Sequence, residues 1–179
     1  MKLAILDRDG VINEDSPDYI KSSDEWHAIS GSLEAIAKLN QAGFTVVVVT
    51  NQSGVGRGYF SQKDLQNIHQ KMHQELAKIG GKIDKIYFCP HTPDDNCDCR
   101  KPKAGMFKQI AQDYKIDLQG AINIGDTLRD IQAGEAFGCR NILVLTGKGE
   151  KIFKDNPEIQ AEVFPNLAST VDALLKEIF

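Results

Sequence analysis

The sequence predicts an α/β fold, a Rossmann-like three-layer sandwich in which a mostly parallel central sheet lies between two layers of helices. Short apolar runs alternate with amphipathic stretches along the whole chain, as in consecutive β-α-β units. Several apolar runs end in polar or acidic residues, as expected where parallel strands meet at a ligand-binding edge. The 179 residues show no internal repeat or linker, so residues 1–179 are expected to form one domain.

Each predicted strand is a short apolar run, and buried parallel strands are apolar on both faces. In chain order the predicted strands are Leu3–Leu6, Thr45–Thr50, Ile86–Cys89, Ala121–Ile124 and Asn141–Leu145. Helices are expected between and after them, near residues 32–42, 62–79, 105–115, 128–137 and 168–178. The irregular stretches 12–31 and 90–104 are long, and long loops often carry function.

The helix expected over residues 62–79 has the clearest pattern. Apolar residues recur at three- and four-residue steps and form one stripe, namely Leu65, Ile68, Met72, Leu76 and Ile79. Ser61 and Asp64 have the spacing of a capping box, and Gly80-Gly81 ends the helix. His69 and His73 are one turn apart on this polar helix, and we interpret both as solvent-facing residues rather than metal ligands.

Composition narrows the classes of partner. The net charge is −4 and the pI is about 5.6, which argues against a nucleic-acid partner held by broad basic patches. No apolar stretch approaches the roughly 20 residues that span a bilayer, and the chain opens on a strand rather than a leader peptide. We therefore expect a cytoplasmic protein without a membrane partner. Nothing in the sequence requires a dimer, so a monomer is expected.

Acidic residues follow two of the predicted strands. Asp7 and Asp9 follow the first strand, and Asp126 follows the fourth. Carboxylates this close repel one another unless a positive charge lies between them. If the three meet at one edge of the sheet, they form an oxygen-rich site suited to Mg²⁺, with water and a phosphate as further ligands. The alternative interpretation is a set of unrelated acidic strand ends.

Further polar groups at the same edge suit a phosphate. The Thr50 hydroxyl and the backbone N–H groups of the following Asn51, Gln52 and Ser53 would bind phosphate oxygens, and Lys101 adds a compact positive charge. A carboxylate beside a metal-bound phosphate, such as Asp7, is a candidate nucleophile that would form an aspartyl-phosphate. A second carboxylate two residues on would protonate the leaving oxygen and later activate water.

A second metal is predicted in the loop over residues 90–104. Cys89 and His91, like Cys97 and Cys99, are two residues apart, so in extended chain each pair projects to one side. Three thiolates and one imidazole fit tetrahedral Zn²⁺ and leave no open position, which indicates a structural site. Free buried thiols and a disulfide are the alternatives. Cys139 lies outside the group and is interpreted as a packed core residue, as are Trp26 and Phe44.

The glycine-rich GVGRG, residues 54–58, lacks the spacing of a dinucleotide-binding fingerprint. Its Arg57 is either a phosphate contact or an ordinary loop arginine.

Four segments, LDRDGVI, VVVTNQSG, RKP and INIGDTLRD, resemble the motifs of the haloacid dehalogenase-like phosphatases over roughly residues 3–147. The resemblance implies that Asp7 is the nucleophile and that Asp9 is the general acid/base and binds Mg²⁺ through its backbone carbonyl. It also implies that Thr50 and Lys101 stabilise the transferring phosphoryl group and that Asp126 is a Mg²⁺ ligand. The short segments between strands leave no room for a large cap domain, so the site is expected to be open.

Within that superfamily, TNQSGVGRGYF and the Cys/His loop running into Arg-Lys-Pro resemble the D-glycero-D-manno-heptose 1,7-bisphosphate 7-phosphatases. This resemblance implies removal of the C7 phosphate from a small phosphorylated sugar. Arg100 is expected to bind the retained C1 phosphate through its planar fork. The predicted sugar contacts are Asn13, Asp15 and Tyr19. Thr127, which is also predicted to contact the substrate, stands where this family commonly has lysine. The alternatives are a histidinol-phosphate phosphatase, a polynucleotide 3′-phosphatase and a non-catalytic metal-binding scaffold.

Overall fold

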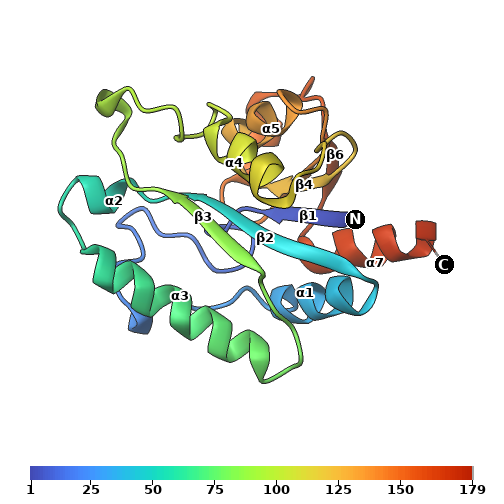
Figure 1. Ribbon diagram of the computed structural model, residues 1–179, viewed down its shortest axis with the longest axis horizontal. Helices are drawn as coiled ribbons and strands as arrows, with labels where there is room; N and C mark the ends of the chain where they lie inside the picture. The colour runs from blue at the N-terminus through green and yellow to red at the C-terminus, as the bar shows by residue number, and fades with distance from the viewer. Residues whose placement is uncertain (179) are drawn as a thin grey trace.

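A single parallel sheet organises the computed structural model, which describes residues 1–178 (Figure 1). The strands lie in the order β3-β2-β1-β4-β5-β6, and every pair of neighbours is parallel. Their bounds are β1 Lys2–Leu6, β2 Phe44–Asn51, β3 Lys85–Cys89, β4 Ile122–Gly125, β5 Arg140–Val144 and β6 Glu162–Phe164. This architecture confirms the predicted α/β class.

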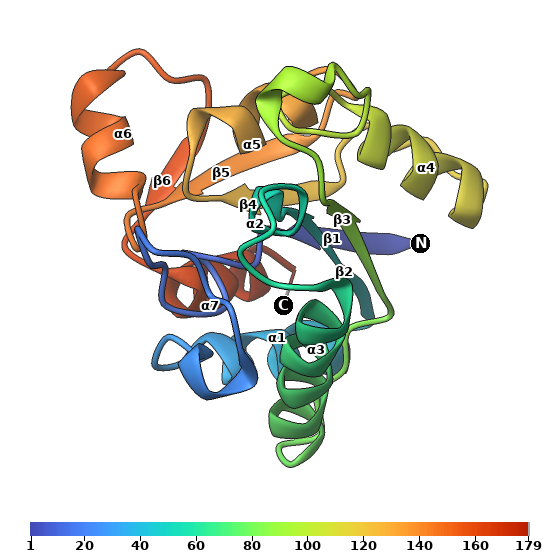
Figure 2. The same ribbon diagram turned by 90° about the vertical axis from the view of Figure 1, so that its left-hand side faces the viewer.

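Helices cover both faces of the sheet (Figure 2). Their bounds are α1 Ser32–Gln41, α2 Ser53–Gly56, α3 Gln62–Ala77, α4 Gly105–Tyr114, α5 Leu128–Glu135, α6 Gly149–Asp155 and α7 Leu167–Ile178, with short 3₁₀ turns at Ser23–Glu25 and Pro93–Asp95. On one face α1, α3 and α7 pack against the strands, and on the other face α4 and α5 do so. Successive residues of β1 alternate between these two cores, with Leu6 in the first and Ile5 in the second.

Strand β1 lies at the centre of the sheet, and its register positions the site. Leu6 is paired with Val48 of β2 on one side and Ile124 of β4 on the other. The Asp7 N–H continues the ladder by donating to the Ile124 carbonyl at 2.9 Å. Chain segments that follow the three strands therefore emerge together at the carboxyl edge of the sheet.

The five predicted strands and five predicted helices are all present, with shifts at their ends. Strand β6 and the short helices α2 and α6 were not predicted from the apolar pattern, because none is long enough to show a period. The Ser61–Asp64 capping box is confirmed. Helix α3 ends at Ala77, so Ile79 falls beyond it and is exposed rather than part of the buried stripe.

The core predictions for Trp26, Phe44 and Cys139 are confirmed, since all three are buried. Between residues 1 and 178, the structure has no helix with the length and apolar character needed to cross a bilayer.

Candidate active site

A cavity of about 260 Å³ opens at the carboxyl edge of the sheet, where the segments after β1, β2 and β4 meet. Most of the predicted site residues line it, namely Asp7, Asp9, Asp15, Tyr19, Asn51, Gln52, Ser53, Arg57, Arg100, Lys101, Asp126 and Thr127. These come from segments far apart in the sequence, which the parallel topology brings to one edge.

Two predicted residues lie behind the cavity wall instead. The Asn13 side chain is fully buried, and its amide donates to Asp9 Oδ1 at 2.9 Å and to the Glu14 carbonyl. Because this amide is already bonded to Asp9 and Glu14, the geometry does not favour the predicted contact between Asn13 and a sugar. Thr50 is also buried, and its hydroxyl oxygen accepts a hydrogen bond from Gln52 Nε2 at 2.9 Å. This bond uses a lone pair of the hydroxyl oxygen, so the Thr50 O–H can still donate.

Three carboxylates converge at the floor of the cavity. One oxygen from each of Asp7, Asp126 and Asp130 lies within 4.8 Å of the others. Asp130 was not among the predicted site residues, although it stands four residues after Asp126 in INIGDTLRD. It lies in the first turn of helix α5, where its Oδ2 accepts from the Thr127 N–H at 2.9 Å and from the Thr127 hydroxyl at 2.7 Å. The Asp9 carboxylate does not belong to this group.

Lys101 joins two of these carboxylates. Its Nζ lies 2.6 Å from Asp130 Oδ1 and 3.1 Å from Asp7 Oδ1, and it donates to the Val49 carbonyl at 2.7 Å. Asn51 holds the Lys101 backbone from both sides, with hydrogen bonds of 3.0 and 3.1 Å. Although burial lowers it, the carboxylates of Asp130 and Asp7 keep the pKa of Lys101 above its usual value. Lys101 is thus a fixed cation.

The donor set at the floor fits a hard divalent cation. Burial and the neighbouring carboxylates raise the pKa of Asp7 to about 7 and that of Asp126 to about 8, so a cation among these oxygens would offset a real repulsion. Glycine at residue 10 leaves room for the Asp126 carboxylate beside the turn after β1. Gly10 has φ +82°, and a Cβ there would lie 2.2 Å from Asp126 Oδ2. That same oxygen accepts from the Lys148 N–H at 2.8 Å.

The Asp9 carboxylate is paired with the side chain of the residue before it. The Arg8 guanidinium is fully buried and pairs with Asp9 Oδ1 at 2.8 Å. His69 on α3 lies against the same guanidinium and is buried, so the prediction that His69 faces solvent is wrong. Its neighbour His73 is exposed, as predicted.

The upper wall of the cavity is cationic. Arg57, Arg100 and Arg129 line it, and Lys148 lines the cavity beside Asp15, with its Nζ 3.5 Å from Asp15 Oδ2. Burial and the nearby guanidiniums of Arg129 and Arg57 hold the pKa of Arg100 below its usual range. Arg129 and Lys148 were not predicted as site residues. Arg129 stands inside the acidic motif INIGDTLRD and Lys148 follows the last predicted strand, and neither segment has a pattern that indicates a basic contact. A cluster of like charges around a cavity favours an anionic ligand.

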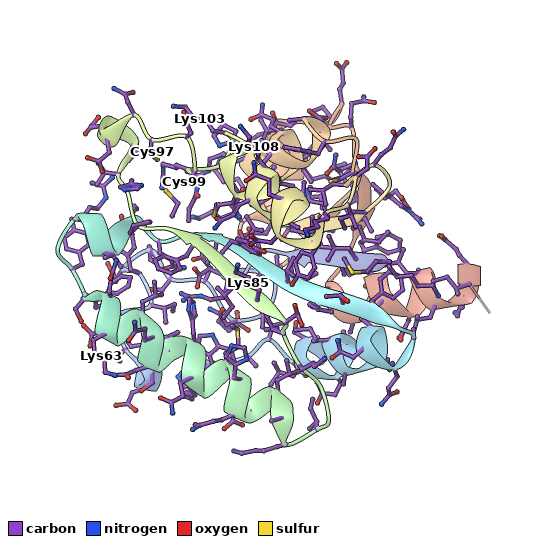
Figure 3. All side chains as sticks on the ribbon, in the orientation of Figure 1. Lys63, Lys85, Cys97, Cys99, Lys103 and Lys108 are labelled. Atoms are coloured by element: carbon purple, nitrogen blue, oxygen red, sulfur yellow. The ribbon has the colours of Figure 1, made fainter. Side chains whose placement is uncertain are left out.

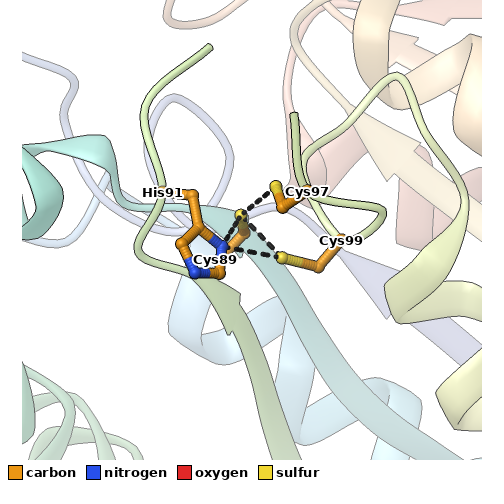
Figure 4. A group of neighbouring side chains, drawn as sticks. All are labelled: Cys89, His91, Cys97 and Cys99. Carbon is orange, nitrogen blue, oxygen red and sulfur yellow. Dashed lines mark hydrogen bonds between the residues drawn. The ribbon is translucent and has the colours of Figure 1, made fainter. Parts of the chain in front are cut away.

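A group of three cysteines and one histidine lies beside this wall (Figure 4). Cys89 ends β3, and Cys97 and Cys99 lie in the loop that leads to α4, near Lys103 (Figure 3). Cys89 Sγ lies 2.9 Å from Cys99 Sγ and 3.6 Å from Cys97 Sγ, and His91 Nδ1 lies 3.3 Å from Cys99 Sγ. Tetrahedral Zn–S bonds of about 2.3 Å place sulfurs roughly 3.8 Å apart, so a small adjustment suits this group to zinc.

A parallel sheet with an aspartate directly after its central strand, a buried lysine and a carboxylate group after β4 is the arrangement of a haloacid dehalogenase-like hydrolase. The matching family model is that of the HAD-hydrolase-like proteins, over residues 98–170. The crystal structure of the D,D-heptose 1,7-bisphosphate phosphatase from Bordetella bronchiseptica, complexed with magnesium and phosphate, is similar to this chain. Its TM-score is 0.96 at 52% identity, with 99% of each chain covered.

Curated relatives agree with this class. The D-glycero-beta-D-manno-heptose-1,7-bisphosphate 7-phosphatase of Bordetella bronchiseptica is 52% identical over 99% of both chains. The enzyme of the same name from Pseudomonas aeruginosa is 50% identical, over 97% of this chain and 98% of its own. The chain therefore belongs to the family of the D-glycero-beta-D-manno-heptose-1,7-bisphosphate 7-phosphatases.

Proposed function

We propose that the chain hydrolyses the C7 phosphate ester of D-glycero-β-D-manno-heptose 1,7-bisphosphate in a Mg²⁺-dependent reaction through an aspartyl-phosphate. The observation that carries this proposal is the position of Asp7, at the floor of the cavity, within reach of Asp126, Asp130 and Lys101. The β anomer is proposed because the similar curated relatives carry it in their names.

The residues divide the reaction between them. An Asp7 carboxylate oxygen attacks phosphorus, the bond from phosphorus to the C7 oxygen breaks, and Asp9 protonates that oxygen. Water then gives a proton to Asp9 and attacks phosphorus, which releases phosphate and restores the Asp7 carboxylate. Lys101 and the Thr50 hydroxyl stabilise charge on the transferring group.

The Mg²⁺ would be held by the carboxylates of Asp7 and Asp126 and the backbone carbonyl of Asp9, and it would neutralise charge on the phosphoryl oxygens. The donor set supports this, because the hard oxygens of the floor suit Mg²⁺ and Lys101 already occupies the Asp130 side.

The cationic wall supports binding of the phosphate that is retained at C1. Arg100 is proposed as the main contact, with Arg57 and Arg129 beside it. Asp15, Tyr19 and Thr127 also line the cavity and are proposed as further substrate contacts, with Asp15 and Tyr19 bound to heptose hydroxyls. A substrate with a phosphate at each end would thus place one phosphate beside the metal at the acidic floor and the other at the basic wall.

Zinc is proposed at Cys89, His91, Cys97 and Cys99 as a structural ion. It would fix the loop that delivers Arg100 to the wall and Lys101 to the floor. We also propose that residues 1–179 act as one domain, as a cytoplasmic monomer without a nucleic-acid partner. The reduced thiols suit the cytoplasm, the net charge of −4 disfavours nucleic acid, and one chain supplies the whole cavity.

The test is a phosphate-release screen with Mg²⁺ and an Asp7→Asn variant. We expect fastest turnover of the β-heptose 1,7-bisphosphate among both anomers, histidinol phosphate, fructose 1,6-bisphosphate and a 3′-phosphorylated oligonucleotide. Asp7→Asn removes the nucleophile and should abolish turnover with an unchanged circular dichroism spectrum, whereas Asp172→Asn, an exposed change on α7, should keep it. Activity retained by Asp7→Asn in a clean preparation would exclude this nucleophile, and faster turnover of histidinol phosphate or the oligonucleotide would move the assignment to that alternative.

A further inference from the structure

The Arg8 side chain is an unusual feature of the segment that carries Asp7 and Asp9. It is fully buried, and a buried guanidinium is costly unless its charge and its donors are matched. Arg8 Nε lies 3.2 Å from Asp9 Oδ1, while Nη2 lies 2.8 Å from the same oxygen and 3.2 Å from Asp9 Oδ2. Two adjacent nitrogens of the fork therefore grip one carboxylate, which fixes its plane as well as its position.

The rest of the Asp9 carboxylate is also held. Asn13 donates to Oδ1 at 2.9 Å, and Gln52 donates to Oδ2 at 2.7 Å. Arg8 is the charged member of this set, and its backbone carbonyl accepts the N–H of Ile12 at 2.8 Å, which anchors the turn after β1. A change at Arg8 would therefore reach Asp9 through both its side chain and its turn.

The outer nitrogen of the guanidinium meets helix α3. Arg8 Nη1 lies 3.2 Å from Nε2 of His69, which is 9% exposed and sits on the buried side of α3 between Leu65 and Met72. Because the guanidinium can only donate, His69 Nε2 must accept, and the imidazole is neutral with its proton on Nδ1. Burial and the Arg8 charge lower the pKa of His69 to about 3, in agreement with this geometry.

We propose that Arg8 and His69 form a positioning pair, in which His69 accepts from the Arg8 guanidinium and Arg8 fixes the orientation of the Asp9 carboxylate toward the cavity. The proposal rests on the assigned role of Asp9 as the general acid/base. Neither residue lines the cavity, so both act through Asp9 and not on the substrate. Helix α3 thereby becomes part of the support of the reacting groups.

The first test compares variants that differ only in the hydrogen-bond acceptor at residue 69. His69→Leu should lower kcat roughly ten- to hundredfold with little change in KM, because a displaced acid/base slows the chemical steps and leaves substrate contacts in place. His69→Gln, whose amide oxygen can reach the place of Nε2, should restore most of the rate. His73→Leu is the matched control, since His73 is exposed one turn away, and should behave as wild type.

Arg8→Lys keeps the positive charge but removes the planar guanidinium. Its kcat should fall as in His69→Leu, because an ammonium cannot bind the carboxylate with two adjacent nitrogens. Wild-type kcat in both His69→Leu and Arg8→Lys would overturn the pair while leaving the proposed function intact. Equal losses in His69→Leu and His69→Gln would also overturn it. An inactive wild type would instead contradict the proposed function.

A spectroscopic test needs no turnover. Long-range ¹H–¹⁵N spectra of the wild-type protein should show His69 as the neutral tautomer with its proton on Nδ1 and without titration between pH 6 and 8. A proton on Nε2, or an imidazolium that titrates in this range, would overturn the pair.

Discussion

Replacing Lys101 with methionine should destabilise the protein by about 3 kcal/mol at pH 7.5. Methionine keeps much of the side-chain length and removes the ammonium, which contacts Asp130 at 2.6 Å, Asp7 at 3.1 Å and the Val49 carbonyl at 2.7 Å. Removing one partner of a buried ion pair generally costs about 3–5 kcal/mol. The lower end applies here because Asp130 keeps two hydrogen bonds from Thr127, and because Asp7 has a pKa of about 7 and can take up a proton cheaply.

The penalty should depend on pH with a definite sign. Although burial raises it, Lys101 and Thr127 hold the pKa of Asp130 below its usual value in the wild type. The ionised Asp130 therefore stabilises the fold above the unfolded pKa of about 3.9, and this contribution is lost as the pH falls through the folded pKa. Without the ammonium, the folded pKa of Asp130 rises, so the variant is penalised most at neutral pH and relieved by protonation in acid.

The assay is urea unfolding in Mg²⁺-free buffer at pH 7.5 and pH 5, with Lys108→Met as the control. Lys108 is an exposed residue of α4, so its replacement should change the unfolding free energy by less than about 0.5 kcal/mol (Figure 3). The Lys101→Met penalty should shrink by about 1 kcal/mol or more at pH 5. A penalty below about 1 kcal/mol, or one equal at both pH values, would refute the reasoning.

Two further predictions concern the loop between β3 and α4. Removing zinc with a chelator should increase hydrogen exchange over residues 89–103 before it affects the strands, and unchanged exchange there would contradict a structural ion. Arg100→Gln should raise KM for the heptose 1,7-bisphosphate about tenfold, since a charge-assisted contact is worth about 1.5–3 kcal/mol, and should leave KM for heptose 7-phosphate unchanged. Parallel rises for both substrates would show that Arg100 does not bind the C1 phosphate.

The fold was predictable wherever an element was long enough to show its period. The apolar run Thr45–Thr50 and the stripe from Leu65 to Leu76 are examples, and both elements are present. Strand β6 has three residues with intermediate or exposed side chains, so neither alternation nor an apolar run marks it. Sequence alone also could not show which acidic residue faces which neighbour, because that depends on register.

The candidate site was likewise predictable in part. Polar residues that follow apolar runs, such as Asp7 and Asp126, can be recognised in the sequence. The chain segments that form the site could therefore be predicted. The partners could not be identified in this way. His69 belongs to a polar helix by composition, yet its contact is Arg8, 61 positions away in sequence. Asp130 is visible as a spacing, but its pairing with Lys101 depends on how the loop after β3 folds back over the sheet.

The central position of β1 has a consequence for folding during synthesis. Asp7 and Asp9 leave the ribosome well before Asp126, which follows β4. Until β4 docks beside β1, a nascent chain would lack the Asp126 side of the proposed Mg²⁺ site. Acquisition of metal affinity during synthesis would therefore report that docking event.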